Sequence, residues 1–292
     1  MCRAKEKRGA ISRIVLSISL KNGSLQMLDG VKWLAKAAFY AVIRSKMDRQ
    51  KVNVQDEYSE GWASYSKYLN SCIVLEDWLQ IKGVEDVPHF CNISGKLTYQ
   101  PFYSMEFNRR KILDTLQREF PDAKSVTEYG CGIGRNLLFL KQHMPHVEFY
   151  GYELCKPGVE IAQSAAKKFG LDVNYSQLDY VGGGEIDYVF QKTDVAFTMY
   201  SLEQLPNSNK LAMENILRHT NYGSIHIEPV PENYPYSFRG IIGRLDHWKA
   251  NYLKNFEKNI SDIAPGRIKT EPLDCSHTPL MFPTLYVIKK NS

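Results

Sequence analysis

The sequence lacks any pair of closely spaced cysteines. Its six cysteines lie far apart along 292 residues, and no two of them form a CxxC pair. Zinc ribbons and disulfide scaffolds need cysteines at short spacings, so this pattern argues against both classes. Isolated thiols are typical of a reducing compartment, and we therefore expect a cytoplasmic protein without a structural metal.

The sequence also lacks a long apolar run. A spanning helix needs roughly 18 or more consecutive apolar residues, but the longest candidate, Met27–Ile43, carries three charged side chains. The apolar stretch Ala10–Leu20 is short and contains Arg13, which argues against a secretory signal peptide. We expect neither a transmembrane helix nor a leader.

Excess positive charge is absent outside the N-terminal fifth. Residues 1–57 hold 12 Lys+Arg and 5 Asp+Glu, whereas residues 58–292 hold the remaining 25 and 27, a net charge of −2. A body that grips phosphate backbones would be basic, so nucleic acid is not the expected partner. The N-terminal excess includes Lys32, Lys36, Arg44, Lys46 and Arg49. These side chains predict peripheral contact with an anionic membrane or a partner protein, and a solvated helix face explains them equally well.

The N-terminal zone, residues 1–104, is predicted to be a helical extension that acts as a lid. Apolar residues at helical spacing predict helices over 27–45 and 57–80, and a third helix over 104–119. Glycine and prolines between 88 and 101 predict a loop.

From residue 122 onward, short apolar runs alternate with helical stretches. The predicted strands cover 125–129, 147–152, 173–177, 195–200 and 224–229, and the helices cover 135–143, 158–169 and 209–219. Nearly continuous apolar strands in this alternation predict a parallel sheet with helices on both faces. A helix over 240–261 precedes two strands, 267–276 and 280–289, which are close enough in sequence to pair antiparallel.

The most informative segment is Val126–Asn136, with the sequence VTEYGCGIGRN. It lies where a predicted strand ends and a helix begins, and its glycines allow a tight turn and close approach of a ligand. Two acids strengthen the signal. Glu128 stands just before the glycines, and Glu153 ends the next strand, where one carboxylate can accept both hydroxyls of a ribose.

A dinucleotide fingerprint has the spacing GxGxxG, whereas this loop has GxGxG directly after an acid. Glu128 would repel a pyrophosphate but suits the ammonium of a zwitterion. The combination resembles motif I of class I S-adenosylmethionine-dependent methyltransferases. The resemblance covers residues 105–229 well and the last strands more loosely. It implies a methyltransferase domain over 105–292, with 230–262 as an insertion on the acceptor side.

This resemblance implies a Rossmann-like three-layer sandwich with a seven-stranded, mostly parallel sheet whose last strand is antiparallel. It implies S-adenosylmethionine as cofactor, with Glu128 and Gly130 at the methionine end. Glu153 would bind the ribose, Leu154 would lie beside the adenine, and Asp179 would meet the adenine amine. The full expected set comprises Glu128, Tyr129, Gly130, Cys131, Gly132, Gly134, Asn136, Glu153, Leu154, Asp179 and Tyr180.

Candidates for acceptor chemistry stand at the ends of the fourth and fifth strands. Tyr200 ends the fourth, and His226 and Glu228 share one face of the fifth by period two, as a base and its orienter would. No ligand spacing predicts a metal. Aromatic residues that flank the core would line the acceptor pocket or pack added helices: Tyr99, Tyr103, Tyr234, Tyr236, Phe238 and Trp248.

Several of these residues also have purely structural explanations. The glycines would form a simple strand-to-helix turn, Glu153 would cap the following helix, and Asp179 would stabilise a loop. For His226, packing within the strand is the favoured explanation.

We predict methyl transfer from S-adenosylmethionine to oxygen of a small-molecule or glycan acceptor. Such an in-line displacement needs alignment and a dry pocket rather than a catalytic triad. Protein or RNA acceptors are the first alternatives. A nicotinamide-dependent oxidoreductase and a non-catalytic scaffold are the others; Glu128 argues against the former, and the intact glycine loop against the latter.

Overall fold

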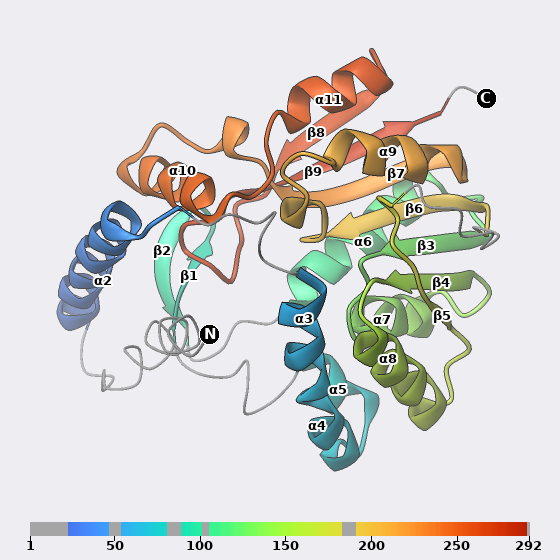
Figure 1. The fold of residues 1–292 in the computed structure, drawn as a ribbon. Helices are drawn as coiled ribbons and strands as arrows, with labels where there is room; N and C mark the ends of the chain where they lie inside the picture. The colour runs from blue at the N-terminus through green and yellow to red at the C-terminus, as the bar shows by residue number, and fades with distance from the viewer. Residues whose placement is uncertain (1–22, 47–53, 81–88, 101–104, 183–190, 291–292) are drawn as a thin grey trace.

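The computed structural model describes residues 23–46, 54–80, 89–100, 105–182 and 191–290. Its centre is a seven-stranded sheet of order β5-β4-β3-β6-β7-β9-β8 (Figure 1). The strands are β3 (Ser125–Tyr129), β4 (Glu148–Glu153), β5 (Asn174–Gln177), β6 (Thr193–Met199), β7 (Thr220–Pro229), β8 (Ile268–Pro272) and β9 (Pro283–Lys289). β3 to β7 run parallel, and β9 runs antiparallel to both β7 and β8. The predicted mostly parallel sheet with an antiparallel last strand is confirmed.

Helices cover both faces of this sheet. They are α6 (Glu106–Glu119), α7 (Arg135–His143), α8 (Lys156–Phe169), α9 (Asn209–Arg218), α10 (Phe238–Ala250) and α11 (Phe256–Ile263), with 3-10 turns η1 (Leu202–Gln204) and η2 (Pro231–Asn233). Within β6, Val195 and Phe197 pack in one cluster with Leu137 of α7, whereas Ala196 packs in the other with Ala212 of α9. The alternation produces the two hydrophobic layers of a three-layer sandwich.

Two helices expected as continuous are broken. The predicted helix over 57–80 is three helices: α3 (Val54–Ala63), α4 (Tyr65–Ser71) and α5 (Leu75–Gln80). Asp77 accounts for the second break, because its carboxylate accepts the backbone N–H groups of Ile73 and Val74, which lie between α4 and α5. The predicted helix over 240–261 is divided into α10 and α11 at Asn251 and Asn255, whose left-handed φ values are +53° and +54°. Asparagine adopts this conformation more readily than most residues.

The loop expected between residues 88 and 101 contains a hairpin instead. Strands β1 (His89–Ile93) and β2 (Lys96–Gln100) pair antiparallel across Ser94 and Gly95. Both turn residues have positive φ, as a tight hairpin turn requires. The N-terminal extension is therefore not wholly helical.

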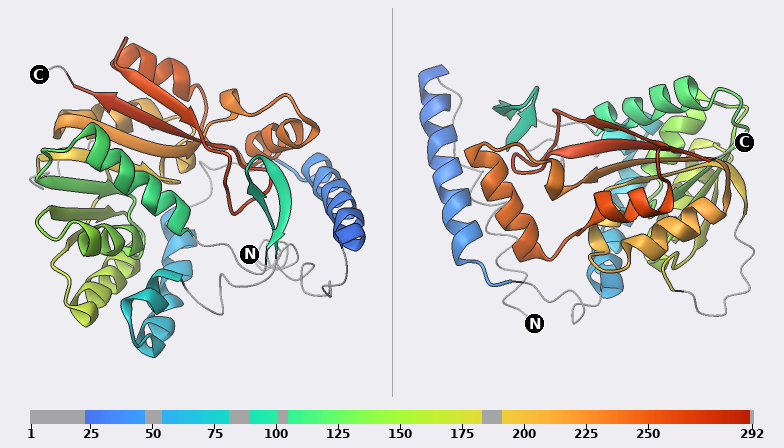
Figure 2. Two further views of the ribbon diagram at one scale, coloured as in Figure 1. Left: turned by 180° about the vertical axis from the view of Figure 1, so that it is seen from behind. Right: turned by 90° about the horizontal axis from the view of Figure 1, so that it is seen from above.

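The expected first helix is present as α2 (Gly23–Ile43). Trp33 of α2 packs against Phe90 of the hairpin with ring centroids 5.9 Å apart. α2 and α10 lie side by side at one end of the molecule (Figure 2). Among the helices in the described ranges, none is long and apolar enough to cross a membrane.

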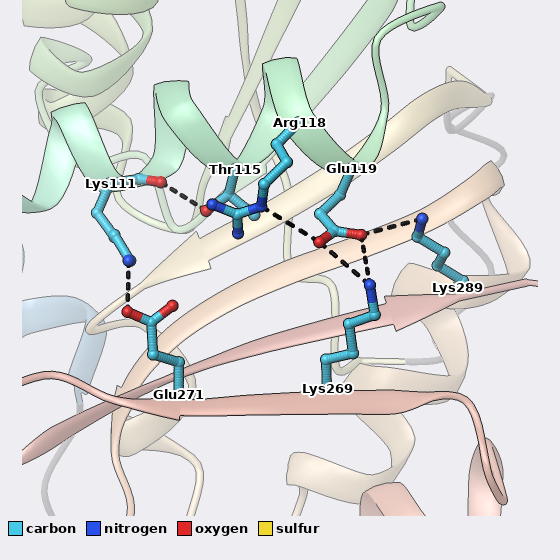
Figure 3. A network of polar contacts seen from close by, with 7 residues as sticks. All are labelled: Lys111, Thr115, Arg118, Glu119, Lys269, Glu271 and Lys289. Carbon is cyan, nitrogen blue, oxygen red and sulfur yellow. Dashed lines mark hydrogen bonds and ion pairs between the residues drawn. The ribbon is translucent and has the colours of Figure 1, made fainter.

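Ion pairs fix α6 onto the antiparallel edge of the sheet (Figure 3). The Glu119 carboxylate accepts Nζ of Lys269 at 2.9 Å and lies 3.0 Å from Nζ of Lys289. These ammonium groups, with Arg118, lower the pKa of Glu119 to about 2. The helix that leads into β3 is thereby fixed to β8 and β9.

Candidate functional site

The glycine-rich loop connects β3 to α7 at the carboxyl ends of the parallel strands. Gly130, Gly132 and Gly134 all have positive φ, at +74°, +55° and +79°. A Cβ on Gly130 would lie 1.9 Å from Oγ of Ser201, so no side chain fits there. The backbone N–H groups of Gly130 and Cys131 both donate to the carbonyl of Tyr152 in β4. The turn is thus a close-packed backbone surface that only glycine can form.

Glu128 lies directly beneath this loop and is fully buried. Asn136 donates Nδ2 to Oε1 of Glu128 at 2.6 Å, and Arg109 donates Nε to Oδ1 of Asn136 at 3.2 Å. The second oxygen, Oε2, is buried without a hydrogen-bond partner among the described residues. Burial raises the pKa of Glu128 to about 8. This free acceptor can bind a cationic donor.

Glu153 joins the ends of β3 and β4. Its carboxylate accepts the N–H of Gly132 at 2.8 Å and that of Cys155 at 3.0 Å. Cys155 is the N-cap residue of α8, so the capping explanation is partly realised. Each oxygen keeps a further lone pair, and the ribose role stays a prediction.

An aromatic cover lies on the other side of the glycine loop. α3 stands beyond the carboxyl ends of the parallel strands and packs against α8 (Figure 1). A Cβ on Gly132 would meet the Trp62 ring at 3.1 Å, and a Cβ on Gly158 would meet the same ring at 3.1 Å. Tyr58 and Tyr65 flank the indole with ring centroids 5.8 and 5.9 Å away. Trp62 of α3 therefore lies against the glycine loop and the start of α8, and the lid role of the N-terminal zone stays a prediction.

Comparisons with known proteins agree with this arrangement. Residues 126–223 match a family model described as a methyltransferase domain. Magnesium protoporphyrin IX methyltransferase (ChlM) from Synechocystis PCC 6803 with bound SAM is similar at 13% identity and a TM-score of 0.52, covering 84% of this chain and 98% of that one. The chain therefore contains a match to a methyltransferase domain over residues 126–223, and it has the fold of this enzyme, which was solved with bound SAM.

Further solved structures were also found to be similar. The same Synechocystis enzyme with bound SAH has a TM-score of 0.54 at 13% identity, over 82% of this chain and 98% of that one. The plantazolicin methyltransferase BpumL with SAH has a TM-score of 0.48 at 10% identity, over 91% and 99%. No significant match was found among curated proteins.

Glu228 fixes the segment that follows β6. Its Oε1 accepts a hydrogen bond from the hydroxyl of Thr198 at 2.8 Å. The same oxygen accepts the backbone N–H groups of Ser201 and Leu202 at 3.2 and 3.1 Å, and Oε2 accepts the N–H of Glu203 at 3.2 Å. Burial raises its pKa to about 7. With four donors around it, this carboxylate positions η1 and keeps Ser201 against the glycine loop.

His226 and Tyr200 have different surroundings. His226 is fully buried, its nitrogens bond to the hydroxyls of Thr198 and Ser224 at 2.9 and 2.8 Å, and burial lowers its pKa to about 3. These contacts support packing rather than base catalysis. Tyr200 has a positive φ of +56°, and its hydroxyl accepts Nδ2 of Asn108 at 3.0 Å. A strained backbone at a strand end is typical of functional sites.

The outer predicted cofactor residues have local structural contacts. Asp179 is exposed and accepts the N–H groups of Val181 and Gly182, as its loop-stabilising explanation requires. Tyr180 donates to or accepts from Oγ of Ser201 at 2.7 Å. Leu154 is half-buried, and its carbonyl accepts Nε2 of Gln177. Tyr129 and Cys131 are buried, so they contribute backbone and packing.

The flanking aromatic residues do not form one pocket among the described residues. Tyr99 packs on Phe90, and Tyr234 is buried against Phe282. Three others, Tyr236, Phe238 and Trp248, are exposed, and Tyr103 lies outside the described residues. The described residues also contain no group of three or more ligands that could hold a metal.

Sequence reasoning missed Trp62, Arg109 and Ser201. Arg109 left a detectable signal, because it shares a helix face with Leu113 and Leu116, where an arginine must have a buried partner. Trp62 gave only a general signal, a segment rich in tryptophan and tyrosine.

Proposed function

We propose that this methyltransferase transfers the methyl group of S-adenosylmethionine to oxygen of a small-molecule or glycan acceptor. The free buried oxygen of Glu128, beneath a turn that has no room for a side chain at Gly130, carries the proposal. The ammonium of the cofactor would supply the missing donor and favour the ionised carboxylate, whereas the pyrophosphate of a nicotinamide dinucleotide would bring only negative charge to this position. Glu153 would hold the ribose, with Leu154 and Asp179 toward the adenine.

The cofactor supplies an electrophilic methyl group. The residues of this chain would align the acceptor with that group and exclude water from the site. Trp62 would exclude water from the glycine loop, because its ring already lies against Gly132. Tyr200 would face the acceptor, with its hydroxyl oriented by Asn108. Asn136 would keep Glu128 in place, through the hydrogen bond that links them.

The net charge of −2 over residues 58–292 supports an acceptor without a polyanionic backbone. Incubation of the full chain with methyl-labelled S-adenosylmethionine and fractionated cell extract tests this. Label in a small metabolite or glycan is the expected result, and a Glu128→Gln variant should leave all fractions unlabelled. Label only in protein or RNA would select the alternative acceptors, whereas binding of a nicotinamide dinucleotide without S-adenosylhomocysteine binding would overturn methyl transfer itself.

A further inference from the structure

The outward face of α2 exposes large apolar side chains. Of the fourteen large hydrophobic residues that are exposed in the described ranges, nine lie on α2, on α10 or in the loop before α10. Phe39 is 60% exposed and Ile43 56% exposed. Gathered apolar exposure of this kind marks an interaction site, whereas single exposed residues do not.

Helical spacing places two lysines within this apolar face. Lys32, Lys36, Phe39 and Ile43 follow one another at three- or four-residue steps, which puts them on one stripe. The opposite face of α2 is occupied, since Trp33 packs on the hairpin and Ala41 is buried. We call the exposed side the α2 surface; it comprises Lys32, Lys36, Phe39, Tyr40, Val42 and Ile43.

The charged side chains that α2 exposes to solvent are mainly positive. The single acid of α2, Asp29, has a side chain only 17% exposed and lies 3.8 Å from Lys32, whose side chain is 77% exposed. The end of α2 adjoins Trp248 of α10, over which the Lys46 ammonium lies at 4.5 Å. Exposed Phe, Tyr and Trp beside Lys is the composition of helices that bind at a lipid headgroup layer.

We propose that the α2 surface binds a bilayer that contains anionic lipids, with the helix lying in the plane of the headgroups. The apolar side chains enter the acyl boundary, and the lysine stems extend up to the lipid phosphates. A second copy of this chain fits less well. A two-fold contact would oppose the same lysines across the interface, and the α2 surface offers no acid to pair with them.

The experiment is cosedimentation of the full chain with vesicles of phosphatidylcholine alone or mixed with phosphatidylglycerol. We expect binding to the mixed vesicles only, weakened by salt. Lys32→Glu with Lys36→Glu should reduce that binding by at least about 30-fold, since each lost basic residue contributes about fivefold and the added carboxylates repel the anionic surface. Phe39→Ser with Ile43→Ser, which keeps the charge, should reduce it at least as much.

Matched control variants make the same kinds of substitution, of lysine and of exposed apolar residues, outside the α2 surface. Lys156→Glu with Lys210→Glu alters the net charge equally, and both lysines are exposed. Ile73→Ser with Leu211→Ser removes exposed apolar side chains of similar kind. Both controls should bind vesicles as the unaltered chain does, and S-adenosylhomocysteine binding verifies that every variant is folded.

Three outcomes would overturn the proposal. The first is no binding of the unaltered chain to anionic vesicles. The second is equal losses in surface and control variants. The third is a dimer in solution that the surface variants dissociate while vesicle binding stays absent.

Discussion

Replacing Glu128 by glutamine should stabilise the protein, and increasingly so as the pH rises. Glutamine has the shape of the protonated acid, and Oε1 can still accept Nδ2 of Asn136. At low pH the two proteins therefore present equivalent groups. As the pH rises, only the natural side chain must ionise, in a fully buried position where one oxygen has no partner.

The magnitude follows from the pKa of Glu128, which burial raises from 4.5 to about 8. A group with a raised folded-state pKa contributes stability that is complete below its unfolded value and is lost as the pH rises through the folded one. Each pKa unit corresponds to about 1.4 kcal/mol, which sets an upper bound of about 5 kcal/mol near pH 8.5. Structural relaxation will reduce it, and we expect a gain of about 2–5 kcal/mol for the variant.

Urea unfolding at pH 5, 6.5 and 8.5, followed by circular dichroism, measures this difference. Glu119→Gln is the matched control of opposite sign. Its lysine partners lower the pKa of Glu119 to about 2, so this carboxylate is ionised at all three pH values, and the variant should be less stable than the natural chain by about the same amount at each. A stability difference for Glu128→Gln that is the same at every pH would refute the reasoning.

Other substitutions test the remaining parts of the site. Trp62→Ala should weaken S-adenosylhomocysteine binding about tenfold in calorimetry, because the ring covers the glycine loop, while Trp248→Ala should not. Glu228→Gln should cost about 1–3 kcal/mol in urea unfolding, because an NH2 group would face a backbone N–H; unchanged stability would contradict its positioning role. Gly130→Ala should abolish cofactor binding, whereas Gly170→Ala, with the same positive φ and open space around it, should cost only about 1 kcal/mol of stability.

The parallel core could be predicted from sequence because both faces of each strand are buried. A strand such as β6 then has an apolar centre, Val195–Phe197, and the strands alternate with helices along the chain. The broken helices could not be predicted in this way, since the helical periodicity continues through Asn251 and Asn255. The hairpin had a local signal, the Ser94-Gly95 dipeptide between two five-residue runs, which the surrounding prolines obscured.

The cofactor site could be located from sequence, but its contacts could not. Glu128 and the glycines are neighbours in the chain, so one segment reveals them. Trp62 and Arg109 reach the loop from other elements, and such contacts depend on how α3 and α6 pack. The spacing therefore predicted an acid at the end of each of these strands, but it could not predict which side chains contact that acid.

Three buried acids at the carboxyl ends of parallel strands show why those surroundings matter. Glu228 accepts four hydrogen bonds, which uses the capacity of its carboxylate and makes it a structural anchor. Glu153 accepts two and joins neighbouring loops with lone pairs to spare. Glu128 accepts one from Asn136 and keeps a whole oxygen unpartnered in the described structure. Since an unpaired buried acceptor destabilises the fold, its presence beneath the glycine turn is best explained by a ligand that supplies the missing donor.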